Sequence, residues 1–396
     1  MTLPAPPRVP ARWRDSLVEC ARWEWRVAQG GNPHGLLETF LREHGLPVAE
    51  LAARAQGVGA AGGVVGAAIL VGAAAIAPDV ASALGTPRRT CAEVPDAVAV
   101  IYKLGDARPA AAAAAAAGTA GIGAWMPSWS PAEHAAAVDQ VRTAIAGGDV
   151  YQVNLVGHTS ARYTGDAAAI ARAVCGVAAA PYAGALAGEG WLVASASPEG
   201  FIEVRDGVVR TRPIKGTATR AADQAADESA RDRLQTSAKD RAEHVMIVDL
   251  ERNDLARVAA DPVRVPTLYA VRPLAGLWHA ESVVEAPLRA GVGLAELLGA
   301  TFPGGSVTGA PKLAALAQIS ALEPISRGPA MGALGWVGAD GTVDLGLTIR
   351  TVAIAAGRVH LWAGGGITWG SDATAEVAEA AAKAAPIRTA LSALQA

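Results

Sequence analysis

A run of strand-like segments followed by long helical segments constrains the fold of this chain more than any other feature. The segments at 149–156, 190–195, 201–205 and 208–212 have strand patterns bounded by turn residues. Asp206-Gly207, between the last two, predicts a tight hairpin turn. Runs of strands followed by helices are typical of an α+β assembly rather than of a doubly wound parallel sheet.

Helices are predicted around these strands. One covers 131–146, because Ser130 is a suitable N-cap, Pro131 suits the first turn and Gly147-Gly148 ends the segment. The remaining elements are predicted as helices over 237–260, over 311–322 and from about residue 373, and as a second hairpin with strands at 342–355 and 359–363.

The N-terminal third is only weakly patterned. Residues 55–78 carry no charge, and a segment of this length could cross a bilayer. Because they are mostly Gly and Ala with short Val and Ile islands, we expect buried strands with glycine turns, with a membrane segment as the alternative. The alanine run 110–117 predicts a linker. We therefore divide the chain into an N-terminal region (1–118) that contributes to the same fold and a motif-dense domain (119–396).

Composition narrows the class of protein. The 396 residues are 51% hydrophobic, enough for a large core. A net charge of −3 without basic clusters argues against a nucleic-acid partner. Cys20, Cys91 and Cys175 are too far apart for a zinc motif, which fits a reducing cytoplasm. The N-terminus lacks the apolar core of a signal peptide, so we expect a cytoplasmic protein without a membrane partner.

The segment Pro213-Ile214-Lys215-Gly216-Thr217 contains the most informative single residue. The chain has only five lysines against twenty-nine arginines, so a position that needed only positive charge would more often hold arginine. Lysine can lose its proton and act as a nucleophile, whereas arginine cannot. The flanking Pro and Gly restrict the backbone. Lys215 is therefore a candidate nucleophile, and a turn lysine between two strands is the alternative.

Two helical segments each present a pair of carboxylates. Asp240 and Glu243 are three residues apart, as are Glu376 and Glu379, with Lys383 one turn later. Two such pairs could converge on a hard cation such as Mg2+, which prefers oxygen ligands. The alternative for each pair is a solvated helix face.

Glycine-rich segments and a glutamate complete the candidates. Residues 303–312 run into a helix start and Gly364-Gly365-Gly366 follows a strand, so backbone N–H groups there could bind carboxylates or phosphates. The triple glycine could equally form a tight turn. Glu199 precedes the Lys215 segment and could bring an acid to the amine, or it could lie on the surface of an edge strand.

Together these segments resemble the chorismate-utilising enzymes over roughly 131–394. The blocks that carry the resemblance are 148–155, 197–199, 213–217, 239–243 with 252–255, 303–312 and 363–366. The resemblance implies an α/β sandwich with two packed antiparallel sheets and outer helices, and makes 119–396 the chorismate-binding catalytic domain.

The resemblance also implies roles for individual residues. Glu243 and Glu379 would bind Mg2+ directly, with Asp240 and Glu376 holding metal-bound waters. The catalytic residues implied are Lys215, Glu199 and His279, although a buried core histidine is the other interpretation of His279. The substrate-binding residues implied are Gln152, Thr217, Thr308, Arg350, Gly364, Gly365, Gly366 and Lys383.

Within the family, two positions indicate the reaction. Anthranilate synthases usually have Ala where this chain has Lys215, and isochorismate or salicylate synthases usually have Lys where it has Gln152. The pair Gln152 and Lys215 resembles component I of aminodeoxychorismate synthase, which aminates chorismate in p-aminobenzoate and folate synthesis. The chain shows no glutamine-amidotransferase signature, so ammonia would come from a separate glutaminase subunit.

One departure keeps other functions open. Ala330 stands where the family usually has an aromatic residue, often a Tyr that helps to hold substrate. The alternatives are therefore anthranilate synthase component I and a non-catalytic subunit that binds a glutaminase. The N-terminal third lacks a recognisable tryptophan-binding signature, so feedback inhibition by tryptophan is not predicted.

Overall fold

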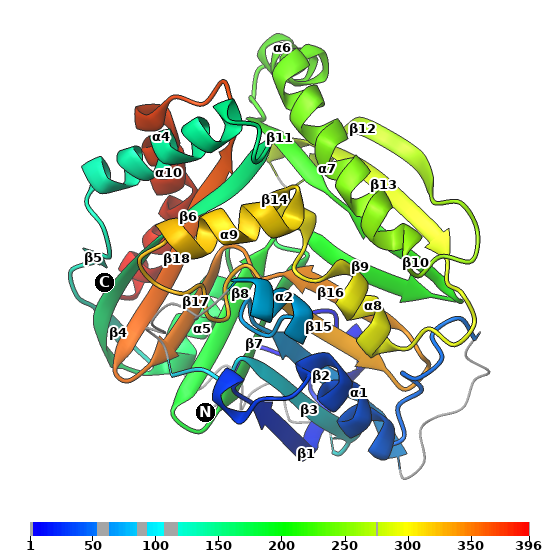
Figure 1. Ribbon diagram of the computed structural model, residues 1–396. Coiled ribbons are helices and arrows are strands. Elements are labelled where there is room, and N and C mark those ends of the chain that lie inside the picture. Colours follow the sequence, from blue (N-terminus) through cyan, green and yellow to red (C-terminus); the bar gives the residue numbers. More distant parts are fainter. Residues whose placement is uncertain (1–2, 54–62, 85–92, 107–117, 275, 396) are drawn as a thin grey trace.

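Two antiparallel sheets packed against each other, with helices outside, form the protein (Figure 1), as the sequence predicted. The computed structural model describes residues 3–53, 63–84, 93–106, 118–274 and 276–395. One large apolar cluster joins the sheets: Ile202, Leu345 and Trp336 of the first sheet belong to the same buried cluster as Val193 and Trp362 of the second. The hydrophobic effect of burying this shared core is the main favourable contribution to the packing of the two sheets.

The first sheet collects strands from both ends of the chain. Its order is β1 (Leu17–Trp25), β3 (Ala97–Leu104), β2 (Val64–Val71), β15 (Ala333–Gly338), β16 (Val343–Leu347), β9 (Gly200–Arg205), β10 (Val208–Arg212), β13 (Leu277–Pro287) and β11 (Ile214–Thr219), with β12 (Arg264–Leu274) also paired to β13. N-terminal strand β2 pairs with C-terminal strand β15, so the two parts of the chain share one sheet. The boundary at 118/119 stays a prediction.

The second sheet comes from the C-terminal two thirds. Its order is β14 (Gly309–Ala310), β6 (Gln152–Gly165), β18 (Arg358–Ile367), β17 (Thr351–Ala355), β8 (Trp191–Ser197) and β7 (Tyr182–Gly188), with β4 (Ala120–Ile122) and β5 (Met126–Pro127) paired to β6. The long pairing of β6 with β18 places Gly365 opposite Leu155 and Gly366 opposite Asn154.

The helices cover the outer surfaces of the sheets. The α-helices are α1 (Pro33–Glu43), α2 (Pro78–Leu84), α4 (Pro131–Ala146), α5 (Ala167–Cys175), α6 (Gln224–Thr236), α7 (Ala238–Ala256), α8 (Leu294–Thr301), α9 (Lys312–Leu322) and α10 (Ala373–Ser392). Short 3-10 turns lie at Ala11–Trp13, Val27–Gln29, Gly305–Val307 and Ala393–Gln395. In Figure 1, α4 and α10 lie together beside β6 and β18, while α6 and α7 lie beside β11 and β13.

Local capping signals explain where helices begin. The Ser130 side chain accepts from the Glu133 N–H and Glu133 reaches back to the Ser130 N–H, a capping box that fixes the predicted start of α4. Ser237 caps α7 through the Asp240 N–H, and Asp372 caps α10 through the Ala375 N–H. The predicted hairpin at Asp206-Gly207 is also confirmed, since both residues have positive φ, as a tight two-residue turn requires.

One predicted strand is wrong in a way that matters for the site. Residues 342–355 were expected to form a single hairpin strand, but β16 and β17 lie in different sheets. The chain crosses between the sheets at 348–350, where Arg350 has φ 48°. A left-handed residue interrupts the extended backbone, and the alternating pattern carries no sign of that interruption.

Smaller differences concern element ends. The strand expected over 149–156 begins at Gln152 and runs on to Gly165, and the helix expected over 237–260 ends at Ala256. Residues 149–151 instead form a turn after α4, in which the Asp149 N–H donates to the Ala144 carbonyl.

The uncharged N-terminal segment contains a buried strand. Of residues 55–78, β2 spans Val64–Val71 and is buried along nearly its whole length, whereas 55–62 lie outside the described residues. No helix in the described ranges is both long and apolar enough to cross a membrane. The alanine run 110–117 also lies outside the described residues.

Candidate active site

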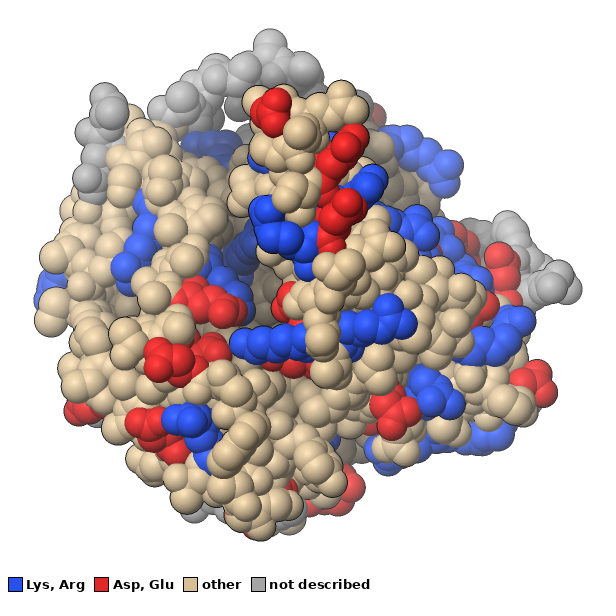
Figure 2. All heavy atoms as spheres, turned by 90° about the horizontal axis from the view of Figure 1, so that it is seen from above, with Lys and Arg blue, Asp and Glu red and all other residues tan. Residues whose placement is uncertain are grey.

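A cavity of about 470 Å3 opens between α7, α10 and the two sheets. Its wall contains Glu199, Lys215, Thr217, Asp240, Glu243, His279, Arg350, Gly364, Gly366, Glu376, Glu379 and Lys383, so most of the predicted site residues meet at one place. Seen from above, the molecule is hollowed near its centre, with acidic and basic side chains around the hollow (Figure 2). These residues come from segments more than 180 positions apart in the chain.

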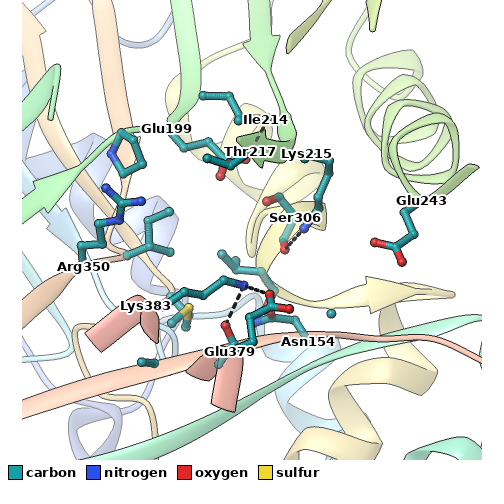
Figure 3. Close-up of a pocket in the computed structure, with 18 of the residues that line it drawn as sticks. Asn154, Glu199, Ile214, Lys215, Thr217, Glu243, Ser306, Arg350, Glu379 and Lys383 are labelled. Atoms are coloured by element: carbon teal, nitrogen blue, oxygen red, sulfur yellow. Dashed lines mark hydrogen bonds and ion pairs between the residues drawn. The ribbon is translucent and has the colours of Figure 1, made fainter. Parts of the chain in front are cut away.

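Lys215 lies on strand β11 and is directed into the cavity (Figure 3). The pairing of β11 with β13 is interrupted between Lys215 and Thr217, where Gly216 has φ 77°. A bulge of this kind re-aims the side chain next to it, and glycine adopts positive φ without strain. The amine Nζ donates to the Ser306 carbonyl at 3.4 Å. Burial lowers the pKa of Lys215, which favours the neutral amine, while the nearby Glu199 carboxylate opposes that shift.

Glu199 lies near Lys215, directly before β9. Its side chain is 5% exposed. Burial raises the pKa of Glu199, and the charge of Lys215 and hydrogen bonds from the Ser306 side chain and the Ile214 N–H act against that shift. The net shift is upward, so burial favours the protonated carboxylic acid, the form that can donate a proton.

A histidine and an arginine line the neighbouring wall. His279, on β13, is 4% exposed; its Nδ1 lies 3.3 Å from Thr217 Oγ1, and its buried Nε2 has no hydrogen-bond partner. Burial lowers the pKa of His279, and the charge of Arg350 lowers it further. Arg350 itself forms no ion pair with a described carboxylate. A neutral imidazole with an open nitrogen and an unpaired guanidinium can both bind an anionic ligand with oxygen atoms.

The triple glycine is part of strand β18 and not a separate turn. A Cβ on Gly364 would lie 1.9 Å from the Leu155 carbonyl oxygen, and one on Gly366 would lie 2.1 Å from Gln152 Nε2. A Cβ on Gly365 would lie 3.2 Å from Glu376 Oε2 and 3.3 Å from Glu379 Oε1. Because glycine has no side chain, β6 and α10 can both approach β18 closely at these three positions.

The two acidic pairs face the same cavity from two helices. Burial raises the pKa of Glu243 on α7, and the negative charges of Asp240 and Glu376 raise it further. On α10, Ser371 Oγ donates to Glu376 Oε1 at 2.6 Å and Lys383 pairs with Glu379 at 2.7 Å. Burial acts to raise the pKa of Glu379, but the charges of Lys383, Lys239 and Lys215 together hold that pKa below its ordinary value. Mutually repelling carboxylates from two elements are a donor set that suits a hard divalent cation.

The described carboxylates do not form a closed metal cage. No three His, Cys, Asp or Glu side chains in the described ranges come close enough together to hold a metal by themselves. A cation that takes one carboxylate from each helix and fills its remaining positions with water and ligand needs no such cluster. The residues present therefore fit Mg2+, and its binding stays a prediction.

Three predicted substrate-binding residues lie outside the cavity wall. Gln152 is 1% exposed, its Nε2 lies behind Gly366, and its Oε1 has no hydrogen-bond partner. Thr308 Oγ1 donates to the Gly304 carbonyl, and Gly365 lies beneath the α10 carboxylates. Their contact with substrate stays a prediction, and in this structure they support the wall from behind.

The cavity also contains residues that the sequence prediction did not single out. They include Asn154, Pro198, Lys239, Ser306, Met331 and Trp362. Ser306 and Asn154 fall inside motif blocks, so their position was a usable signal, whereas Met331 and Trp362 reach the cavity only through the fold. Ala330 is 1% exposed in the core and does not line the cavity.

Comparison with known proteins identifies the family. The model of the chorismate binding enzyme family matches residues 84–389. This chain therefore belongs to the chorismate binding enzymes, as the sequence motifs indicated.

Individual relatives carry two different names. The chain is 42% identical over 257 residues to aminodeoxychorismate synthase component 1 of Klebsiella aerogenes, a match covering 65% of this chain and 57% of the relative. It is 38% identical over 284 residues to anthranilate synthase component 1 of Streptomyces coelicolor, covering 71% of this chain and 55% of the relative. The matches thus span little more than half of these relatives.

A solved structure supports the fold. Anthranilate synthase component I from Streptococcus pneumoniae superposes with a TM-score of 0.76, covering 96% of this chain and 92% of the other at 24% identity. The likeness at this identity concerns the fold alone.

Proposed function

We propose that this chain is the aminating component of an aminodeoxychorismate synthase, which converts chorismate and ammonia to 4-amino-4-deoxychorismate. The observation that carries the proposal is Lys215 in the cavity wall beside the buried acid Glu199. Burial shifts both pKa values toward the neutral forms, an amine and a carboxylic acid. These are the forms that a nucleophile and a general acid need.

In the first step, Lys215 Nζ forms a bond to C2 of chorismate. Both ring double bonds shift, from C1=C2 to C1=C6 and from C5=C6 to C4=C5, as the C4–O bond breaks. Glu199 gives its proton to the departing hydroxyl, which leaves as water. The resulting secondary ammonium loses its extra proton to the Glu199 carboxylate. The product of this step is a covalent adduct that retains the enolpyruvyl group.

In the second step, ammonia bonds to C4 and both ring double bonds shift back as the C2–N bond to Lys215 breaks. Glu199 returns the proton to the departing amine. The proposed product keeps the enolpyruvyl group, so formation of an aromatic ring needs a separate lyase. A glutamine amidotransferase subunit would supply the ammonia, in keeping with the "component 1" names of the relatives.

Cations around the cavity would bind the two carboxylates of chorismate. Arg350 and the backbone amides near Gly364 and Gly366, all in the cavity wall, would hold the enolpyruvyl carboxylate, with Lys383 nearby. Mg2+, held by Glu243 and Glu379 and through water by Asp240 and Glu376, would neutralise and orient the ring carboxylate.

Anthranilate synthase component I is the second candidate, favoured by the match to the Streptomyces coelicolor relative. By the resemblance, that activity usually goes with Ala at the position of Lys215. Product identity separates the two reactions.

The deciding experiment supplies the purified chain with chorismate, Mg2+ and excess ammonium at alkaline pH, and analyses the products by liquid chromatography and mass spectrometry. An aminated, non-aromatic product that retains the enolpyruvyl group supports the proposal. If the product is anthranilate, the proposed activity is wrong and the chain is an anthranilate synthase component. Unreacted chorismate, with chorismate binding intact, would indicate a non-catalytic subunit.

A further inference from the structure

A second cavity, of about 360 Å3, lies next to the candidate active site between α4, α10, β5, β6 and β18. Leu361 and Ala363 of β18 line both cavities. In Figure 1 the helices α4 and α10 lie beside β6 and β18 at this place. The volume falls within the roughly 300–1,000 Å3 usual for small-molecule sites, yet none of its remaining lining residues has a part in the proposed reaction.

Arg388 gives this cavity a positive charge that no described acid neutralises. The described lining residues include no Asp or Glu, and Arg388 forms no ion pair with any described carboxylate. Its terminal nitrogen donates to Thr159 Oγ1 at 3.3 Å, and its buried Nε has no hydrogen-bond partner. Arg388 makes one side-chain hydrogen bond among the described residues, so its terminal N–H groups keep donors for a carboxylate, the anion that a guanidinium matches best.

Aromatic side chains line one part of the cavity wall, and small or aliphatic residues line much of the rest. The guanidinium of Arg388 lies over the ring of Trp125, 5.3 Å from the ring centroid, which is within the roughly 6 Å reach of a cation–π contact. Trp129 stacks on His134, with ring centroids 4.5 Å apart and 17° between planes. Gly157 allows this arrangement, because a Cβ there would lie 2.9 Å from Trp129 Nε1. Burial lowers the pKa of both lining histidines, His134 and His158, which favours their uncharged forms.

We propose that this cavity is a second ligand site that takes a small aromatic carboxylate, with the ring against the Trp125 and Trp129 side and the carboxylate on Arg388. A ring with a carboxylate satisfies both the flat walls and the unpaired guanidinium. The occupant would also touch Ala380 and Ala381 of α10, the helix that carries Glu376 and Glu379 into the active-site cavity.

The test is calorimetric titration of the whole chain with benzoate, without chorismate or Mg2+, so that its outcome is independent of turnover. We expect saturable binding at one site, and acetate, which lacks the ring, should bind at least about tenfold more weakly. Arg388→Met removes the charge but keeps the apolar stem and should weaken benzoate binding about tenfold or more. Ala381→Leu, at an exposed helix position in the cavity wall, should weaken it by filling space.

Two controls keep the result interpretable. Arg142→Met removes an arginine from α4 outside the cavity and should leave benzoate binding unchanged. Arg350→Met removes a cation from the active-site cavity and should also leave it unchanged. The proposal is overturned if benzoate does not bind to the wild-type chain. It is also overturned if binding is lost in Arg350→Met but kept in Arg388→Met. Thermal melting followed by circular dichroism checks that each variant is folded.

Discussion

Lys215 and Glu199 show how burial can prepare two residues for opposite tasks. In water at neutral pH the amine would be charged and the acid ionised, and neither form suits nucleophilic attack with proton donation. Burial opposes both charges, so it lowers the pKa of Lys215 and raises that of Glu199. Their mutual attraction works against this shift, and the direction of each pKa shows that burial is the stronger effect.

Lys215→Ala should abolish the covalent adduct with chorismate, measured by intact-protein mass spectrometry after mixing without ammonia. Amination should slow by at least about 100-fold, because the nucleophile is gone. In the wild type, adduct formation should rise with pH and level off below the pH at which an ordinary lysine loses its proton, since the pKa is lowered. Lys103→Ala, an exposed lysine on β3, is the matched control. An unchanged rate in Lys215→Ala would remove the nucleophile role.

Glu251, behind the cavity, should make the fold less stable as pH rises. Burial raises its pKa to about 8, and Thr211 Oγ1 donates to Glu251 Oε2 at 2.8 Å. Between the ordinary pKa near 4.3 and about 8, the folded state therefore holds a proton that the unfolded state has lost. The free energy of unfolding falls with pH in that window, by up to ~1.4 kcal/mol per pH unit from this group.

Urea unfolding at pH 5 and pH 8 measures this effect. Glu251→Gln has no proton to lose, so the difference in unfolding free energy between the two pH values should shrink in this variant. Equal pH dependence in the variant and the wild type would show that Glu251 does not carry a raised pKa.

At the scale of elements, strand β18 forms one wall of the site, where its three consecutive glycines leave room for the neighbouring elements. Gly364→Ala and Gly365→Ala make the same chemical change at neighbouring positions but should have different effects. The methyl group at 364 meets the fixed Leu155 carbonyl at 1.9 Å, whereas at 365 it meets the ends of Glu376 and Glu379 at just over 3 Å. The first contact is with backbone, which cannot move away without breaking the sheet.

We therefore expect Gly364→Ala to lower Tm strongly, and Gly365→Ala to remain folded with a weaker response to Mg2+. Thermal melts and Mg2+ titrations of activity give the two measurements. Similar melting temperatures for both variants would contradict the close packing of β18 on β6.

Helix α7 offers a matched pair of acids for the metal prediction. Glu243 lines the cavity, whereas the Asp249 side chain is 74% exposed and pairs with Arg252 on the same helix. Glu243→Gln should raise the Mg2+ concentration needed for half-maximal activity at least about tenfold, because it removes a charged oxygen donor. Asp249→Asn should leave that concentration unchanged. A similar Mg2+ requirement in both variants would show that Glu243 is not a ligand.

The sequence predicted those elements whose signals are local. Ser130 and Pro131 fixed the start of α4, and Asp206-Gly207 fixed a hairpin, because capping and turn geometry depend on a few neighbouring residues. The crossing at Arg350 was missed, since the choice between two sheets depends on distant partners. Likewise, Gln152 belongs to a recognisable motif, but only the pairing of β6 with β18 shows that it lies behind Gly366.

At the scale of the whole molecule, the cavity joins the two sheets. Lys215 and His279 come from strands of the first sheet, and the glycines of β18 come from the second. Arg350 lies at the crossing between β16 and β17, one strand in each sheet. A ligand in the cavity therefore contacts both sheets at once, and its binding free energy adds to the stability of the assembled fold.

Chorismate with Mg2+ should accordingly raise the Tm of the wild-type chain. At 100 times its Kd a ligand that binds only the folded state contributes about 2.7 kcal/mol, which corresponds to a Tm shift of about 3 °C for a chain of this size. Arg350→Met should reduce the shift at the same ligand concentration, because a carboxylate loses its cation, while Arg142→Met on α4 should keep it. Melting in ammonia-free buffer separates binding from turnover. Equal shifts in all three proteins would mean that chorismate is not held at the crossing between the sheets, and the assignment of Arg350 would then have to be abandoned.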